Sequence, residues 1–189
     1  MALTFFATLG LGIEIGILTG VVLSLLLLLY QTSRPNVVEL GAIRHPSGMC
    51  HYRNVKRFPD AKISEVHLIV RFDNQLHFAN SSYFKESIIT MLDKKPIKPS
   101  YLVLDASNIY DMDSTGLHVL EDIYITLKGR SIQLVISGAK GAVRDLFKRA
   151  GFFQKLESTN HFMQVTDAIA YSESDDLDDW NYAAIQSDY

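Results

Sequence analysis

Residues 111–156 read DMDSTGLHVLEDIYITLKGRSIQLVISGAKGAVRDLFKRAGFFQKL, and their pattern decides the fold. Apolar side chains recur at helical spacing after the Asp-Ser-Thr-Gly turn, and this first helix ends at Gly129. The apolar run at 132–136 predicts a buried strand, and a second amphipathic helix follows it and ends at Gly151. Helices alternating with a buried strand in this way are typical of an α/β domain with a largely parallel sheet.

The alternation of strands and helices continues on both sides of this stretch. The other expected strands are short runs of β-branched and aromatic residues, at 37–40, 52–57, 66–72, 76–79 and 101–106. The runs at 37–40 and 52–57 are expected at the edge of the sheet. The other expected helices cover residues 84–92, with caps at 80–82, and residues 162–171. This amount of secondary structure is sufficient for one hydrophobic core.

The first 30 residues are unlike the rest of the chain, because they contain no Lys or Arg and only one acid, Glu14. The apolar run from Ala2 to Tyr30 exceeds the ~20 residues needed to cross a membrane. A secretory signal peptide fits poorly, since no cation precedes the run and no small-residue cleavage site follows it. Residues 1–30 are therefore expected to form a transmembrane segment.

Small residues recur at every fourth position of this segment, at Thr8, Gly12, Gly16, Gly20 and Ser24. Membrane helices approach each other closely over such residues, so Gly12 to Ser24 are expected to pack against transmembrane helices outside this chain. Glycine is also common in membrane helices without any packing role. A third interpretation is a break at Gly10–Gly12, with a new helix from about Ile13 and Glu14 at the membrane interface.

Charge predicts the orientation of the chain. Residues 31–36 form a short polar linker that spans about 20 Å at most. Five cations follow the apolar run, at Arg34, Arg44, Arg53, Lys56 and Arg57. By the positive-inside rule, the domain at 37–171 then lies in the cytoplasm. Residues 172–189 hold six acids and no base, which is typical of a disordered tail.

Composition excludes several classes of function. The net charge of -3 gives no basic surplus for nucleic-acid binding, so no nucleic-acid partner is expected. Cys50 is the one cysteine and cannot form an internal disulfide. The chain has no glycine-rich phosphate loop, and its six histidines lack metal-ligand spacing. We expect no catalytic residues, no metal and no cofactor.

The strongest candidate for a functional site is the turn formed by Asp113, Ser114, Thr115 and Gly116. It lies between a strand and a helix, where parallel α/β sheets gather their ligands. In one interpretation Asp113 or Ser114 is an ordinary helix cap. In the other, Ser114 is a phosphorylation site or partner contact, because a phosphate is favoured at a helix N-terminus.

The quoted stretch closely resembles the STAS domain of bacterial anti-sigma-factor antagonists. The shared features are the Asp-Ser-Thr-Gly turn, the Gly129-bounded helix, the strand after it and the helix end at Gly151-Phe152. In those antagonists a partner kinase phosphorylates the serine that matches Ser114. The segments LGIEIGILTGVVLSLLLLLYQTSRP and Arg71-Phe72…Tyr83-Phe84 resemble the last membrane helix and the STAS domain of sulfate-permease (SulP) anion transporters.

The resemblance covers roughly residues 3–171 and implies a STAS-type mixed or parallel sheet with flanking helices. The family's transport core of about a dozen helices is absent here, so no anion-binding residue carries over. It implies the C-terminal region of a secondary anion transporter, with a cytoplasmic regulatory and assembly domain and a homodimeric assembly. The alternative is a membrane-tethered phospho-switch protein that binds a kinase or regulator through Ser114.

Overall fold

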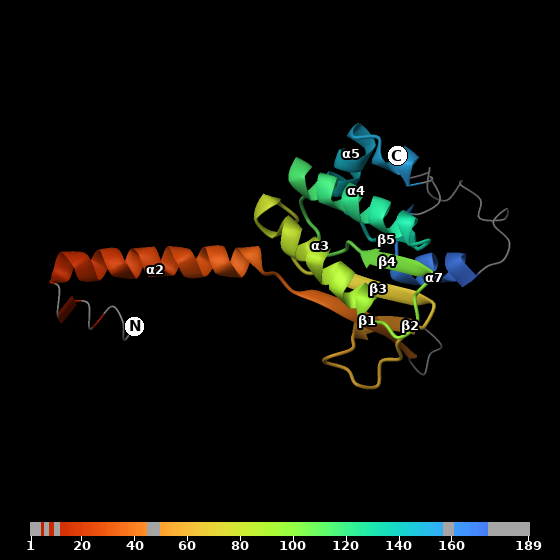
Figure 1. The fold of residues 1–189 in the computed structure, drawn as a ribbon, viewed down its shortest axis with the longest axis horizontal. Coiled ribbons are helices and arrows are strands. Elements are labelled where there is room, and N and C mark those ends of the chain that lie inside the picture. The colour runs from red at the N-terminus through yellow and green to blue at the C-terminus, as the bar shows by residue number, and fades with distance from the viewer. Residues whose placement is uncertain (1–4, 6–7, 10–11, 45–49, 157–160, 174–189) are drawn as a thin grey trace. The chain divides into compact units, whose positions relative to one another are not determined.

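The computed structural model describes residues 5, 8–9, 12–44, 50–156 and 161–173 (Figure 1). The chain divides into two compact units, Met1–Pro35 and Asn36–Tyr189.

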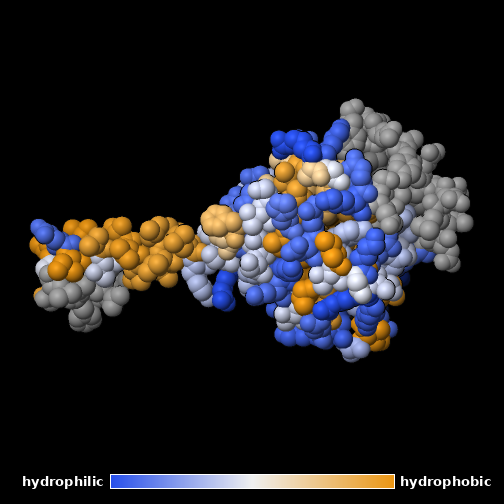
Figure 2. All heavy atoms as spheres, turned by 45° about the horizontal axis from the view of Figure 1, so that its top comes forward, coloured by the Kyte–Doolittle hydropathy of each residue, from blue (hydrophilic) through white to orange (hydrophobic). Residues whose placement is uncertain are grey.

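The first unit contains helix α2 (Ile13–Ser33), which is the one helix of the described residues long and apolar enough to cross a membrane. Apolar side chains cover it in Figure 2. Gly12 precedes the helix with φ at 94°, a backbone conformation that only glycine adopts freely. Thr8 packs on Gly16 so closely that a Cβ there would overlap it. The break near Gly12 is therefore confirmed.

The prediction that one helix carries all five small residues is wrong. Thr8 and Gly12 precede α2, and only Gly16, Gly20 and Ser24 follow one another at four-residue spacing along it. The physical reason is the left-handed conformation of Gly12, which interrupts the helical backbone. Glu14 lies exposed in the first turn of α2.

The second unit is built on a six-stranded mixed sheet. Its strands are β1 (Val37–Arg44), β2 (Cys50–Asn54), β3 (His67–Phe72), β4 (Tyr101–Asp105), β5 (Gln133–Ser137) and β6 (His161–Phe162). Their order is β2-β1-β3-β4-β5-β6. Strands β3 to β6 are parallel, whereas β1 is antiparallel to both β2 and β3. The α/β class with a mixed, largely parallel sheet is confirmed.

Helices cover both faces of the sheet (Figure 1). They are α3 (Phe78–Asp93), α4 (Ser114–Gly129), α5 (Gly141–Arg149), α6 (Phe152–Lys155) and α7 (Val165–Glu173). Alternate residues of each strand point to opposite faces, so Leu68 and Val70 join the large core under α3 to α6. Ile69 joins a smaller core under α7.

The expected strand at 76–79 is wrong, because helix α3 already begins at Phe78. His77 caps α3 by accepting the Ala79 N–H, and the Asn80 side chain accepts the His77 N–H in return. This reciprocal cap places Asn80 inside the first turn and not before the helix. Leu76 forms only an isolated bridge with Met112.

Further boundaries differ from the sequence predictions. Strand β1 is longer than expected and lies inside the sheet, so of the two strands expected at the edge only β2 is there. Strand β2 covers Cys50–Asn54 and not residues 52–57. Phe162 belongs to β6, and the last helix begins at Val165. The predicted disorder of the acidic tail concerns residues 174–189, which lie outside the described residues.

Candidate functional site

Backbone hydrogen bonds connect the Ser114 turn to the turn that precedes α3. The Leu76 N–H donates to the Asp111 carbonyl, and the Leu76 carbonyl accepts the Asp113 N–H, both at 3.1 Å. Helix α4 lies so close that a Cβ at Gly116 would come within 2.6 Å of the Leu76 oxygen. Only glycine fits there without displacing backbone, so Gly116 fixes how α4 packs on this turn.

Asp113 joins the N-termini of two helices with one carboxylate. One oxygen accepts the Gly116 N–H of α4 at 2.7 Å, and the other accepts the Phe78 N–H of α3 at 3.0 Å. The positive ends of both helix dipoles favour this negative charge. The structure thus assigns the cap to Asp113, and the capping role left open for Ser114 is wrong.

Ser114 and Thr115 are exposed in the first turn of α4, and they take no part in the cap. Two aromatic side chains belong to the same pair of turns: Phe78 is 75% exposed and Tyr110 is 54% exposed.

A second polar cluster holds the start of β1 to the loop that leads to Ser114. The Asp73 carboxylate accepts hydrogen bonds from Arg71 at 2.6 Å, Asn108 at 2.7 Å and Asn36 at 3.2 Å. Partial burial opposes the ionised form of Asp73. The hydrogen bonds from Arg71, Asn108 and Asn36 and the Arg71 charge outweigh burial and hold the pKa below its usual range. Asp73 therefore stays charged and cross-links three segments.

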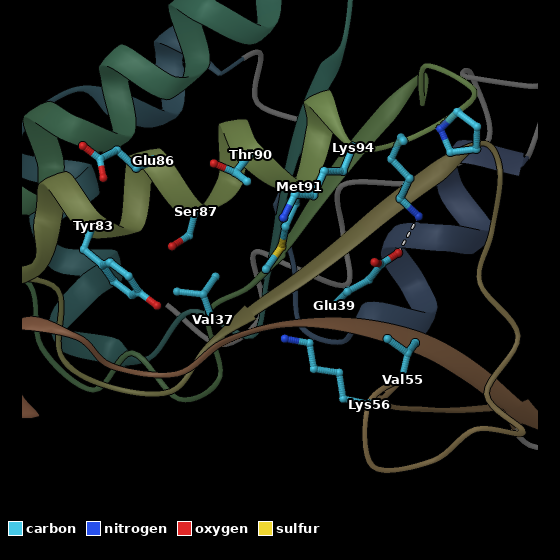
Figure 3. A pocket seen from close by; sticks show the side chains of 12 residues that line it. Val37, Glu39, Val55, Lys56, Tyr83, Glu86, Ser87, Thr90, Met91 and Lys94 are labelled. Carbon is cyan, nitrogen blue, oxygen red and sulfur yellow. Dashed lines mark hydrogen bonds and ion pairs between the residues drawn. The ribbon is translucent and has the colours of Figure 1, made fainter.

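A groove of about 580 Å³ opens on the α3 side of the sheet. In Figure 3 the side chains of α3 line one wall, from Tyr83 to Lys94. Val37, Glu39, Val55 and Lys56 line the other wall. Lys95 and Glu39 form a half-buried ion pair at 2.5 Å within it. The groove therefore combines apolar side chains, Val37, Val55 and Met91, with charged ones.

A third polar cluster attaches α7 to the sheet. The Nε2 atom of buried His67 lies 2.6 Å from the Ser172 hydroxyl, and its Nδ1 atom lies 3.0 Å from the Ser64 hydroxyl. The Ser172 hydroxyl donates to the Ile169 carbonyl, so it accepts the hydrogen on Nε2. A neutral imidazole satisfies every partner in this network.

Sequence reasoning missed the Asp73 cluster, the groove and the His67 network. The partners of Asp73 lie up to 37 residues from it in the sequence, and His67 and Ser172 are 105 residues apart. No local pattern marks such pairs. Among the described residues, no group of three or more His, Cys, Asp or Glu side chains is arranged to hold a metal ion.

The STAS domain family model matches residues 58–168. This range includes the Ser114 turn, the parallel strands and most of the helices described above. The chain belongs to the STAS domain family.

The chain is also similar to transport proteins, and this similarity extends beyond the matched STAS range. It is 31% identical to Sulfate transporter 1.2 of Arabidopsis thaliana over 173 residues, which is 87% of this chain and 26% of the relative. It therefore spans about a quarter of the length of the curated relatives that it matches.

Solved structures agree with this fold. Murine Slc26a9, described as an anion transporter, aligns at a TM-score of 0.74 and 23% identity, over 89% of this chain and 27% of that one. The SulP transporter STAS domain of Vibrio cholerae aligns at a TM-score of 0.50 and 18% identity, over 62% and 89%. Anti-sigma factor antagonists align at 16% identity or lower, which shows the shared fold alone.

Proposed function

We propose that this chain is the STAS-bearing part of a SulP-like secondary anion transporter for sulfate-type anions. The observation that carries the proposal is the extent of the similarity. Only 21 residues follow the matched STAS range, yet Sulfate transporter 1.2 aligns over 87% of the chain. The alignment must therefore reach back through β1 into α2.

In this proposal α2 is a membrane helix of the transporter, and Gly16, Gly20 and Ser24 pack against core helices that the present sequence does not contain. The STAS domain lies in the cytoplasm as a regulatory and assembly module, in a transporter that is a homodimer. Ser114 and Thr115 meet a regulatory protein or kinase, while Asp113 and Gly116 hold the turn in shape. The chain itself has no enzymatic role.

The alternative is a membrane-tethered phospho-switch protein that acts through the same turn. Its support is the Asp-Ser-Thr-Gly motif and a fold-level likeness to anti-sigma factor antagonists. The similarity through α2 favours the transporter, because a soluble antagonist does not explain an aligned membrane helix. An adjacent or in-frame gene segment that encodes a multi-helix permease would distinguish the two.

Orientation is tested with Cys50, the one cysteine of the chain, which is half-buried in edge strand β2. A membrane-impermeant thiol reagent should leave Cys50 unlabelled in intact cells and label it after lysis. A Cys50→Ser chain is the control for background labelling. Strong labelling of intact cells would place the domain outside and contradict the cytoplasmic role.

A further inference from the structure

The loop between β2 and β3 is held in a defined shape by hydrogen bonds near both of its ends. The buried Asn54 side chain accepts the Lys56 N–H at 2.9 Å, and the Asn54 carbonyl accepts the Arg57 N–H at 3.0 Å. Further along, Lys62 exchanges two backbone hydrogen bonds with Ala42 of β1, each at 2.9 Å. The loop is therefore a folded turn, and in Figure 1 it is drawn in gold and extends away from the sheet.

The exposed side chains of this loop are mainly basic. Residues 53–63 expose four cations and one acid, which are Arg53, Lys56, Arg57, Lys62 and Asp60. None of these cations takes part in an ion pair among the described residues. The next acid is Glu65, and the segment keeps a positive surplus even when Glu65 is included. Phe58 directly follows Arg57 and is 45% exposed, so the loop presents an aromatic ring beside its cations.

The covalent path from helix α2 to this loop is short. The Val55 N–H donates to the Glu39 carbonyl at 3.1 Å, so the loop begins level with Glu39 of β1. Helix α2 ends at Ser33, and the path from Ser33 to Glu39 spans about 20 Å at most even when fully extended. In a chain whose α2 crosses the membrane, the linker therefore keeps the loop near the bilayer surface. The inference below rests on this part of the proposed function.

We propose that this loop binds the anionic lipid headgroups of the bilayer that α2 crosses, with Lys56 and Arg57 against the phosphates and Phe58 among the headgroups. Clusters of about four to eight Lys or Arg residues near the cytoplasmic end of a membrane helix are typical of binding to anionic lipid. The attraction extends over about one Debye length, ~8 Å at physiological salt, so the short linker is what keeps the cations in range. The linker also gives the headgroups a high effective concentration, which favours lipid over an acidic protein as the partner.

Trp180 is the only tryptophan of the chain, so a full chain with Trp180→Phe and Phe58→Trp carries its one tryptophan in the loop. This chain is placed in nanodiscs of phosphatidylcholine alone or of an equal mixture with phosphatidylglycerol, with the same share of acyl chains brominated to quench tryptophan fluorescence. We expect quenching in the mixed bilayer, and its loss in the neutral bilayer or in ~0.5 M salt, which screens the attraction. Lys56→Glu with Arg57→Glu should remove the quenching in the mixed bilayer, whereas Lys56→Arg with Arg57→Lys should retain it.

The matched control is Lys128→Glu with Lys140→Glu, which changes the net charge equally at exposed positions outside the loop and should retain the quenching. Equal quenching in the neutral and the mixed bilayer, or quenching that survives Lys56→Glu with Arg57→Glu, would overturn the proposal, because the linker alone would then bring the loop to the lipid. Absence of quenching in both bilayers would also overturn it and leave the cations to solvent or to an acidic protein. A chain that does not enter the nanodiscs at all would contradict the proposed function itself, so the two failures are distinguishable.

Discussion

Asp113 and Ser114 are neighbours in the sequence but differ in what they contribute. The Asp113 carboxylate accepts backbone hydrogen bonds from both α3 and α4, whereas the Ser114 side chain is exposed at the start of α4. A carboxylate placed at two helix N-termini stabilises the fold through both hydrogen bonds and helix dipoles. An exposed serine that does not cap is free to serve contacts with other molecules.

We predict that Asp113→Ala lowers the free energy of unfolding of the STAS unit by about 2 kcal/mol. Ser114→Ala and Ser114→Asp should stay within about 0.5 kcal/mol of the wild type. Urea denaturation of residues 36–189 measures all three variants. Asp113→Asn is the matched control, since asparagine keeps the geometry of the cap without the charge. Destabilisation by Ser114→Ala comparable to that by Asp113→Ala would show that Ser114 is structural and remove it from the proposed partner surface.

Helix α7 is attached to the sheet by a hydrogen bond between the buried His67 imidazole and Ser172. Burial lowers the pKa of His67 below its usual value of about 6.5, and the Glu173 charge opposes this change. The folded state therefore holds His67 neutral at a pH where the unfolded chain already binds a proton. Stability from this network is fully present above the usual histidine pKa and is lost as the pH falls below it.

We predict that the free energy of unfolding of residues 36–189 decreases between pH 7 and pH 5, by no more than ~1.4 kcal/mol per pH unit from this group. The low pKa of Asp73 adds a separate loss only near pH 4 and below. His67→Gln keeps a polar side chain but does not titrate, so it should flatten the dependence above pH 5. An unchanged slope in His67→Gln would show that other groups cause it.

The helices and strands also show which features of the fold local sequence patterns can predict. Helical spacing predicts the presence of α3, α4, α5 and α7, because each buries one stripe of apolar side chains against the sheet. The start of α3 was mispredicted because Leu76 to Ala79 look like a strand, and a histidine cap is not a usual signal. The interior position of β1 depends on long-range pairing that no local pattern encodes.

For the whole molecule, the sequence predicted the STAS fold through its resemblance to known families and located the Ser114 turn. It did not predict that Asp113 joins two helices, because the contact with Phe78 spans 35 residues. Nor did it predict the groove, since β1, the segment after β2 and α3 form it only after the sheet has assembled. Such features arise from tertiary packing and have no period in the sequence.

The central claim is that this chain completes a SulP-like anion transporter. The most direct test is labelled sulfate uptake in cells that express a SulP membrane core without the matching region, alone or with this chain joined to it. We predict uptake with the chain and little without it. Gly20→Leu should abolish uptake by separating α2 from the core, whereas the control Val21→Leu, at an exposed position of the same helix, should retain it. Equal uptake with and without the chain would show that the chain does not complete such a transporter.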